Sequence, residues 1–425
     1  MRHYIPLAIF MVLISCSEMG NQLITDKKDY NVFLASEPVK TTSKYFELWN
    51  SKIKEDSMQL LSFGVVGGEY SRYFQHTGDI QYLKKAEKAL QRAVRIAAIG
   101  KAGYYRSLAR NYISQHRFKE ALVLADSART LGSGVNATQS LLFDLHMELG
   151  NYDRAGAYLD SIANFSDFGY LIRLAKWNDQ LGDLDQTIRL MEKAMAKVEN
   201  SKNKDLMLWC YTNIADYYGH AGRIQESYDH YLKSLAIDPQ NAYAKKGIAW
   251  IVFSYEKNSE EALRILDSVI DNHKAPDYYL LKSEIAEYHG DSWESLINLD
   301  RYMKLVQDRS YGDMYNVYNI SVYLERTGQY EKALWLAKRE VDNRPTPESY
   351  SLLAYTYFKM GELSEALHIV EKHIEGQSAE PGIHYRIAEI YKASGNHARA
   401  MQLKEELNGA IYELGPQMAE PISRL

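Results

Sequence analysis

The chain repeats a pairing of one aliphatic residue with an aromatic residue four positions later. The pairs are Leu108 with Tyr112, Ile214 with Tyr218, Leu353 with Tyr357 and Ile387 with Tyr391. Two residues four positions apart lie on the same face of an α-helix, so each pair marks an apolar helix face. Only 9 of the 425 residues are proline, which interrupts helices. The pattern therefore predicts an all-α protein made of long helices, each with one buried face.

One position, mostly glycine, recurs at intervals that run from 32 residues (Gly150 to Gly182) to 40 residues (Gly182 to Gly222). Glycine occupies it at Gly78, Gly150, Gly182, Gly222, Gly290, Gly328, Gly361 and Gly395. His116 and Lys257 fill the two gaps in this series. A glycine is common just after a helix ends, because φ turns positive there. We therefore expect a turn between two helices at each of these positions.

Small residues form two columns around the turn position. Seven residues before it lie Ser71, Ala109, Ala175, Ala215, Ser283, Ser321, Ala354 and Ala388. Five residues after it lie Ala121, Ala155, Thr187, Ser227, Ala262, Ser295, Ala333, Ala366 and Ala400. Small side chains at both places allow the two helices of a pair to approach closely. Phe143 and Trp250 depart from the first column, and the register of residues 242–270 is left open.

This arrangement resembles the tetratricopeptide repeat family, whose period is about 34 residues, over residues 66–413. The resemblance implies an all-α, right-handed α-solenoid of about ten helix-turn-helix repeats, whose first helices line a concave groove. Residues 44–65 are then expected to form N-terminal capping helices, and residues 414–425 to form a C-terminal tail that is frayed from Pro416 onward.

The N-terminal segment has the pattern of a secretion signal. Arg2 and His3 precede an apolar run, residues 5–14, that is too short to span a bilayer, which needs about 20 residues. The sequence Leu13-Ile14-Ser15-Cys16 resembles the lipobox of bacterial lipoproteins. That resemblance implies removal of residues 1–15 and lipidation of Cys16, with residues 16–43 as a flexible tether. An ordinary signal peptide, or a short membrane anchor with an incidental cysteine, is the alternative.

The residues after Cys16 bear on location. In the bacterial lipoproteins that the chain resembles, an aspartate after the lipidated cysteine favours the inner membrane, and Ser17 stands here instead. Ser17-Glu18 also looks like part of the surface-export signal of Bacteroidota lipoproteins. We therefore expect a lipid-anchored protein of the cell envelope, at the outer membrane, with its periplasmic or surface face left open.

Charge and motifs narrow the function further. Lys and Arg number 50 against 55 Asp and Glu, so the chain lacks the basic surplus of a nucleic-acid-binding protein. No Gly-rich phosphate loop, HExxH, GxSxG or CxxC motif is present. His368 and His373 are five positions apart, which on a helix separates their directions by about 140° and argues against one shared metal. We expect no enzymatic activity, no cofactor and no metal site.

The expected groove carries the candidate binding residues. They are Arg72, Arg106, Arg110, Lys176, Asp216, Glu284, Tyr318, Tyr355, Tyr385 and Glu389. This order predicts a groove that is positive toward its N-terminal end and negative toward its C-terminal end, which would orient a bound partner. The leading interpretation is a scaffold that binds a protein or peptide in the groove. The alternatives are a surface glycan-binding lipoprotein that uses the groove tyrosines, and solvated groove walls without any partner.

Overall fold

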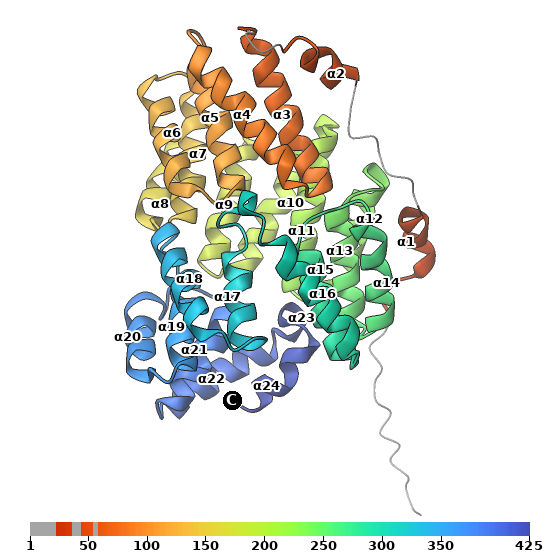
Figure 1. The fold of residues 1–425 in the computed structure, drawn as a ribbon, viewed down its shortest axis with the longest axis vertical. Coiled ribbons are helices and arrows are strands. Elements are labelled where there is room, and N and C mark those ends of the chain that lie inside the picture. Colours follow the sequence, from red (N-terminus) through yellow and green to blue (C-terminus); the bar gives the residue numbers. More distant parts are fainter. Residues whose placement is uncertain (1–22, 36–43, 54–57) are drawn as a thin grey trace, which may run out of the picture.

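The computed structural model describes residues 23–35, 44–53 and 58–425, and every regular element in these ranges is helical (Figure 1). Ten helix pairs follow one another in this described part of the chain. They are α3 (Leu60–Thr77) with α4 (Ile80–Ile96), α5 (Lys101–Ser114) with α6 (Phe118–Thr130), α7 (Val135–Glu148) with α8 (Tyr152–Ser161), α9 (Phe168–Gln180) with α10 (Leu184–Ser201), α11 (Lys204–His220) with α12 (Ile224–Ile237), α13 (Ala242–Trp250) with α14 (Ser259–Ile270), α15 (Asp277–His289) with α16 (Ser292–Leu305), α17 (Asn316–Glu325) with α18 (Tyr330–Asn343), α19 (Pro347–Lys359) with α20 (Leu363–His373), and α21 (Pro381–Ala393) with α22 (His397–Asn408). The predicted α-solenoid of helix-turn-helix repeats is confirmed. The predicted signal peptide and Cys16 lie outside the described residues.

The turn inside each pair is built as the sequence predicts. All eight glycines at the turn position have positive φ, and so do the two residues that replace glycine, His116 (φ 56°) and Lys257 (φ 57°). The N–H of the following residue then bonds a carbonyl in the last turn of the first helix, as Arg117 does to Tyr112 at 2.9 Å. Such a bond satisfies a carbonyl that the helix end leaves free. The predicted turns are therefore confirmed.

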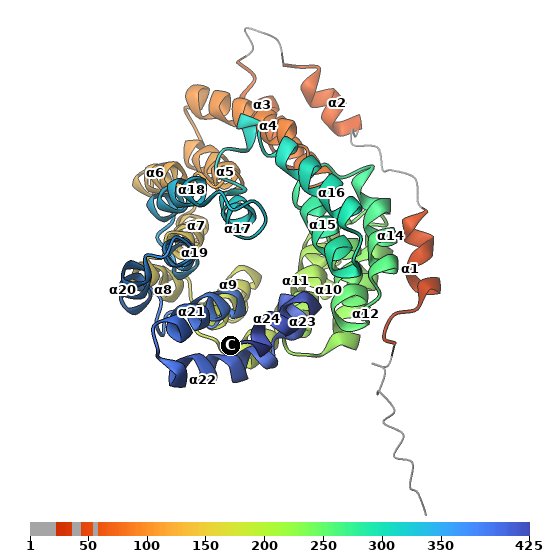
Figure 2. The same cartoon turned by 60° about the horizontal axis from the view of Figure 1, so that its bottom comes forward.

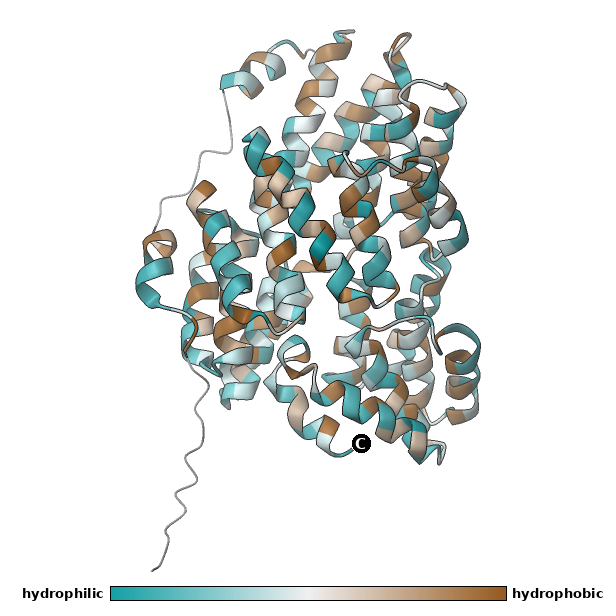
Figure 3. Ribbon diagram, turned by 180° about the vertical axis from the view of Figure 1, so that it is seen from behind, coloured by the Kyte–Doolittle hydropathy of each residue, from teal (hydrophilic) through white to brown (hydrophobic). Residues whose placement is uncertain are grey.

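The small-residue columns lie where paired helices touch. Ala215 and Ala354 of the first column are fully buried, and so is Ala366 of the second. Where the small residues are polar, they bond across the pair: the Ser283 hydroxyl donates to the Ser295 carbonyl at 2.9 Å. In Figure 3, apolar and polar residues alternate along the helices, as expected when each helix buries one face.

The sixth pair contains an irregularity that explains its uncertain register. Helix α13 continues into a π-helical segment, η1 (Ile251–Tyr255), in which the Glu256 N–H bonds the Ile251 carbonyl at 3.2 Å. A π-turn inserts one extra residue into a helix and shifts every later position. In the same helix, a Cβ at Gly247 would lie only 2.2 Å from the Tyr231 ring, so this position requires glycine.

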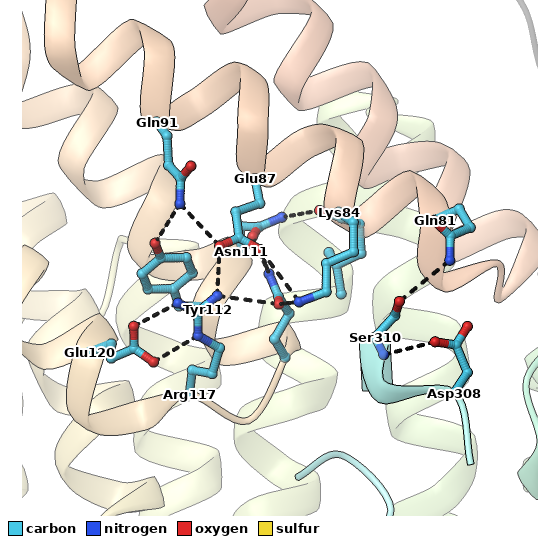
Figure 4. Close-up of polar contacts among 12 residues, drawn as sticks. Gln81, Lys84, Glu87, Gln91, Asn111, Tyr112, Arg117, Glu120, Asp308 and Ser310 are labelled. Carbon is cyan, nitrogen blue, oxygen red and sulfur yellow. Dashed lines mark hydrogen bonds and ion pairs between the residues drawn. The ribbon is translucent and has the colours of Figure 1, made fainter. Parts of the chain in front are cut away.

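A polar cluster fastens the first pair to the turn of the second pair (Figure 4). Glu87 on α4 accepts hydrogen bonds from Arg117 at 2.7 Å and from Gln115 at 3.1 Å. Arg117 also pairs with Glu120 at 2.6 Å and lies 3.8 Å from the Tyr112 ring centre. Burial acts to raise the pKa of Glu87, but Arg117 and Gln115 outweigh it and lower the pKa below its ordinary value. The carboxylate therefore stays charged and holds neighbouring repeats together.

The solenoid winds once and then stacks on itself. Helices α17–α22 lie directly below α5–α9 in Figure 1, and in Figure 2 the two sets overlap around one ring. The amide of Gln180 donates to the Gln377 carbonyl at 3.1 Å, across 197 residues of sequence. The amide of Asn343 donates to the His116 carbonyl at 2.9 Å, across 227 residues. One superhelical turn therefore takes about six repeats of ~34 residues, and we call the contact between the two turns the seam.

The N-terminal segment differs from the tether that we expected over residues 16–43. Its described part forms helix α1 (Lys27–Leu34), which packs on the outer face of α12 and α14. Tyr30 is 1% exposed, and its hydroxyl donates to Glu261 at 2.7 Å. Glu256 accepts the backbone N–H groups of Ile24 at 2.8 Å and Thr25 at 2.7 Å. Residues 23–35 are therefore part of the folded body, because one buried tyrosine and two glutamates fix them there.

Both ends of the solenoid are covered by short helices. At the N-terminal end, α2 (Lys44–Asn50) packs Phe46 against Tyr73, with ring centres 5.3 Å apart. The expected capping region, 44–65, is shorter than predicted, because α3 of the first pair already begins at Leu60.

The C-terminal tail is docked rather than frayed. It forms α23 (Ile411–Leu414), the 3₁₀ segment η3 (Pro416–Met418) and α24 (Ala419–Ser423). Ile422 is fully buried in the same apolar cluster as Leu403 and Leu407 of α22. The apolar residues of the tail therefore cover the face that the last helix pair would otherwise expose.

Candidate functional site

A cavity of about 360 Å³ opens on the concave face of the solenoid, among the first helices α11, α13, α15 and α17. These helices lie on the inside of the ring in Figure 2. The cavity is lined by Asp216, His220, Tyr231, Tyr243, Lys246, Gly247, Trp250, Asp277, Leu280, Leu281, Glu284, Tyr318, Tyr412 and Glu413. Three of the ten predicted groove residues, Asp216, Glu284 and Tyr318, meet in this one cavity.

Asp216 is held by two tyrosine hydroxyls. Tyr231 of α12 donates a short hydrogen bond to one carboxylate oxygen, and Tyr243 of α13 donates to the other at 2.7 Å. Burial raises the pKa of Asp216 above its ordinary value, although both phenol donors act to lower it. Three consecutive helices thus fix this carboxylate in the cavity wall.

Lys246 lines the cavity and already forms an ion pair with Asp277. Its ammonium lies 3.2 Å from the Asp277 carboxylate and over the rings of Tyr243 and Tyr278, at 5.3 and 5.0 Å. Burial acts to lower the pKa of Lys246, but Asp277 and the surrounding tyrosines outweigh it and raise the pKa. Lys246 and Asp277 therefore form a charged pair whose net charge is zero.

Glu284 faces the cavity without a hydrogen bond or ion pair from any described residue. Arg326, which follows α17, pairs with Glu287 at 2.9 Å and acts to lower the pKa of Glu284 without bonding to it. Burial, with a contribution from Glu325, raises the pKa of Glu284 to about 7. Tyr318 stands in the same wall, 43% exposed, and its hydroxyl also bonds no described residue. The cavity thus presents one carboxyl and one phenol that are free to bind a ligand.

The C-terminal segment closes one side of the cavity. The Tyr412 carbonyl accepts from the Trp250 indole at 3.0 Å and from the Ser254 hydroxyl at 2.6 Å. The next residue, Glu413, lies 2.8 Å from the His220 ring. Burial acts to lower the pKa of His220, but Glu413 outweighs it and raises the pKa above its ordinary value. The end of the second superhelical turn therefore completes a site whose other walls belong to the middle of the chain.

The predicted basic residues of the N-terminal half are mostly engaged. Arg72 pairs with Glu69 at 2.7 Å, and Lys176 pairs with Glu148 at 2.8 Å. Arg106 donates to the Ser133 carbonyl at 2.8 Å and to the Thr138 hydroxyl at 3.0 Å, so it joins two repeats. Arg110, on the same helix, is exposed. Acidic neighbours thus cancel much of the positive strip that the sequence alone predicts.

The predicted residues of the C-terminal half form a packed wall. Tyr355 is only 2% exposed, and its hydroxyl donates a short hydrogen bond to Glu389. Lys359 lies 3.8 Å from Glu389 and 4.7 Å from the Tyr355 ring centre. Tyr385 is half-buried against the same apolar cluster. We expected Tyr355 to stand in the groove, but its ring is part of the core because neighbouring first helices approach closely there.

Several cavity residues are missing from the sequence prediction. Tyr243, Lys246 and Trp250 lie on α13, whose register the π-helical segment obscures. The sequence did mark Trp250 as unusual, because a bulky residue there replaces a small residue of the first column. Tyr412 lies at the end of the expected repeat region, 66–413, but after the last helix of the last pair, so no repeat pattern could place it in the cavity.

Possible metal ligands, the free cysteine and possible membrane-spanning helices were also compared with the sequence predictions. Within the described ranges, no group of three or more histidine, cysteine or acidic residues is arranged to hold a metal ion. His373 instead stacks on Tyr350, with ring centres 3.9 Å apart. Cys210 is buried, and burial raises its thiol pKa to about 12. Among the described helices, none has the length and apolar character needed to cross a membrane.

Comparisons with known proteins agree with the repeat pattern. Residues 170–240 match the tetratricopeptide repeat family, and residues 326–407 match the family described as anaphase-promoting complex, cyclosome, subunit 3. None of the curated proteins matches the chain. Similar solved structures include a tetratricopeptide repeat protein from Parabacteroides merdae, 18% identical, which aligns with 60% of this chain and 96% of its own at a TM-score of 0.35. They also include the APC/C hetero-tetramer Cut9-Hcn1, 12% identical, aligned over 90% of this chain and 96% of that one, again at a TM-score of 0.35. The two matched segments, and ten helix pairs built on the same turn and the same small-residue columns, support a chain of tetratricopeptide repeats.

Proposed function

We propose that this protein is a lipid-anchored scaffold of the cell envelope that binds a protein or peptide partner in its concave groove. Tetratricopeptide repeats generally mediate interactions between proteins. The observation that carries the proposal is the cavity at Glu284 and Tyr318, where two polar side chains face the groove without a partner among the described residues. Most of the other predicted groove residues already have polar partners; these are Arg72, Arg106, Lys176, Asp216, Tyr355 and Glu389. This cavity is therefore where an incoming chain would gain most.

Site-specific photo-crosslinking in envelope preparations tests the groove. A photoreactive phenylalanine at Tyr318 should form an adduct with a partner protein. The matched control carries the same group at Trp335, which is 62% exposed on the second helix α18. Adducts of equal yield at both positions, or none at Tyr318, would contradict groove binding. Specific binding of a glycan array by the purified protein, without a protein adduct, would instead support the glycan-binding alternative.

The anchor rests on the Leu13-Ile14-Ser15-Cys16 segment and needs its own test. Metabolic labelling with an alkyne fatty acid should label the wild-type protein, because Cys16 would carry the acyl chains. The Cys16→Ala variant should be unlabelled and wrongly processed. Cys210→Ala is the matched control and should keep its label, since the Cys210 thiol is buried in the fold. Label that persists in Cys16→Ala would contradict the lipid anchor.

A further inference from the structure

We propose that the concave cavity is an anchor pocket for a basic side chain, an arginine or lysine, of the bound partner. This inference rests on the groove binding proposed above and names the chemistry that the groove selects. It is carried by the charges that the cavity leaves uncompensated and by the aromatic walls around them.

The charges of the cavity do not balance. Four acidic residues line it, namely Asp216, Asp277, Glu284 and Glu413, against Lys246 and His220. The Lys246–Asp277 and His220–Glu413 pairs cancel locally. Two carboxyl groups remain. The first, Asp216, receives only the neutral hydroxyls of two tyrosines, and the second, Glu284, receives no bond from the described residues. A cationic ligand would supply the missing countercharge.

The walls suit a long side chain that ends in a cation. Leu280 and Leu281 offer an apolar surface to the aliphatic stem of an arginine or lysine. Tyr318 and Tyr243 expose 43% and 46% of their surface, and Trp250 stands beside them. Aromatic faces attract a guanidinium or ammonium group within about 6 Å of the ring centre. The cavity volume of about 360 Å³ lies at the small end of ligand pockets, which suits one side chain better than a whole folded element.

The chain itself already places a cation in this environment. Lys246 lies over two tyrosine rings and beside a carboxylate. The partner's basic side chain would find a similar environment, with the Tyr318 ring and the Glu284 carboxyl around its cation. The raised pKa of Glu284 supports the same conclusion, because burial makes its carboxylate costly to ionise and Arg326 offsets only part of that cost. A bound cation would remove that cost.

Two peptide probes test the inference on the full chain. The first is acetyl-Ala-Arg-Ala-amide, and the second replaces arginine with citrulline, which is nearly the same shape but neutral. In a nuclear magnetic resonance titration to millimolar concentration, the arginine peptide should bind saturably and the citrulline peptide at least tenfold more weakly. Equal binding of the two, or binding of neither, would overturn the inference.

Three variants locate the binding. Glu284→Gln keeps the size of the side chain and removes its charge, so arginine-peptide affinity should fall at least tenfold. Glu405→Gln is the control, because Glu405 is exposed on α22 and does not line the cavity, and it should change affinity less than twofold. Tyr318→Lys would place the protein's own ammonium in the pocket and should also abolish binding. Unchanged affinity in either Glu284→Gln or Tyr318→Lys would overturn the inference. A partner adduct at Tyr318 without any arginine preference would leave the proposed function standing and remove only the basic anchor.

Discussion

At Glu284 the surrounding protein sets the charge of a single carboxyl group. Burial and the neighbouring Glu325 raise its pKa from 4.5 to about 7, while Glu287, one turn further along α15, is exposed and pairs with Arg326. Each pKa unit corresponds to about 1.4 kcal/mol of difference between the two protonation states. The folded protein therefore binds this proton more tightly than the unfolded chain does, and ionisation above neutral pH works against folding.

Glu284→Gln should stabilise the protein in a pH-dependent way. Well below pH 4.5 the wild-type carboxyl is protonated in both states, so its raised pKa costs nothing. As pH rises from about 4.5 to about 7 this carboxyl makes the wild-type protein lose stability, a loss that the variant does not share. We expect the variant's melting temperature, followed by circular dichroism, to exceed that of the wild type by several degrees at pH 8 and by much less at pH 5. The same increment at both pH values would contradict this prediction. The control is Glu405→Gln, because Glu405 is exposed on α22.

The small-residue columns allow a second prediction at the residue scale. Ala215 and Ala354 are fully buried between the helices of their pairs. Leucine at either position should overpack the pair and cost about 1–3 kcal/mol. The matched control is Ala196→Leu on α10, where the side chain is exposed. Thermal melts should fall for the two column variants and stay unchanged for the control. A control that loses as much stability as the column variants would show that close helix approach is not the cause.

Among the elements, α1 makes the contact that is hardest to infer from sequence. Its helix is only eight residues long, and it packs on a surface more than 190 residues away in sequence. One fully buried ring, Tyr30, lies in the interface with the partly buried Phe33 and Leu34 beside it, and Glu256 and Glu261 fix the ends. Tyr30 is therefore the most deeply buried apolar contact of this segment.

Tyr30→Ala should release α1 from the solenoid and leave the remainder folded. The substitution removes a buried aromatic ring, which costs about 3–5 kcal/mol in a core, and it removes the hydroxyl that Glu261 accepts. Hydrogen exchange should lose its protection over Lys27–Leu34 and keep it over α19–α22. Val32→Ala is the control, since Val32 is 65% exposed on the same helix. Protection of α1 that survives Tyr30→Ala would mean that the two glutamates and the contacts of Phe33 and Leu34 hold the segment without Tyr30.

The elements that the sequence could predict are those that repeat. Turn residues such as His116 were identifiable without glycine because their neighbours kept the period, and the structure gives them positive φ. The π-helical segment after Trp250 could not be placed, because it breaks that period by one residue. Helix α1 and the C-terminal tail bind surfaces far away in sequence, which no periodicity encodes. Asp216 and Glu284 were predictable as groove residues because they lie on first helices of the repeat. Tyr412 was not predictable, because it follows the last repeat.

At the scale of the whole molecule, the seam turns an open spiral into a closed ring. Loops of the first superhelical turn rest on the connections of the second, with backbone close to backbone. A Cβ at Gly150 would lie 2.5 Å from the Pro345 carbonyl oxygen, and Arg344 reaches Glu148 at 3.5 Å. Neighbouring repeats normally carry most of the stability of a solenoid, so these contacts add a coupling between distant repeats.

Gly150→Ala should disrupt the seam, and Gly222→Ala is a closely matched control. Both glycines have positive φ, 65° and 71°, so alanine strains the backbone similarly at each. Only Gly150 faces the second turn, whereas no other atom lies within 4 Å of a Cβ at Gly222. We expect Gly150→Ala to lower the melting temperature more and to increase the radius of gyration in X-ray scattering. Equal losses in the two variants, with no expansion, would mean that the seam contributes nothing beyond local backbone strain.

The docking of α1 has a consequence for how the molecule would sit at a membrane. With a lipid on Cys16, as proposed, only seven residue steps would separate the anchor from Leu23, where the described segment begins. A chain of that length reaches at most about 25 Å. The side formed by α12 and α14 would then be held close to the bilayer surface, and the ring could neither tumble nor extend away from it. A partner would have to reach the groove along the membrane or from the opposite side. The short stretch between Cys16 and Leu23 would therefore set the direction of approach.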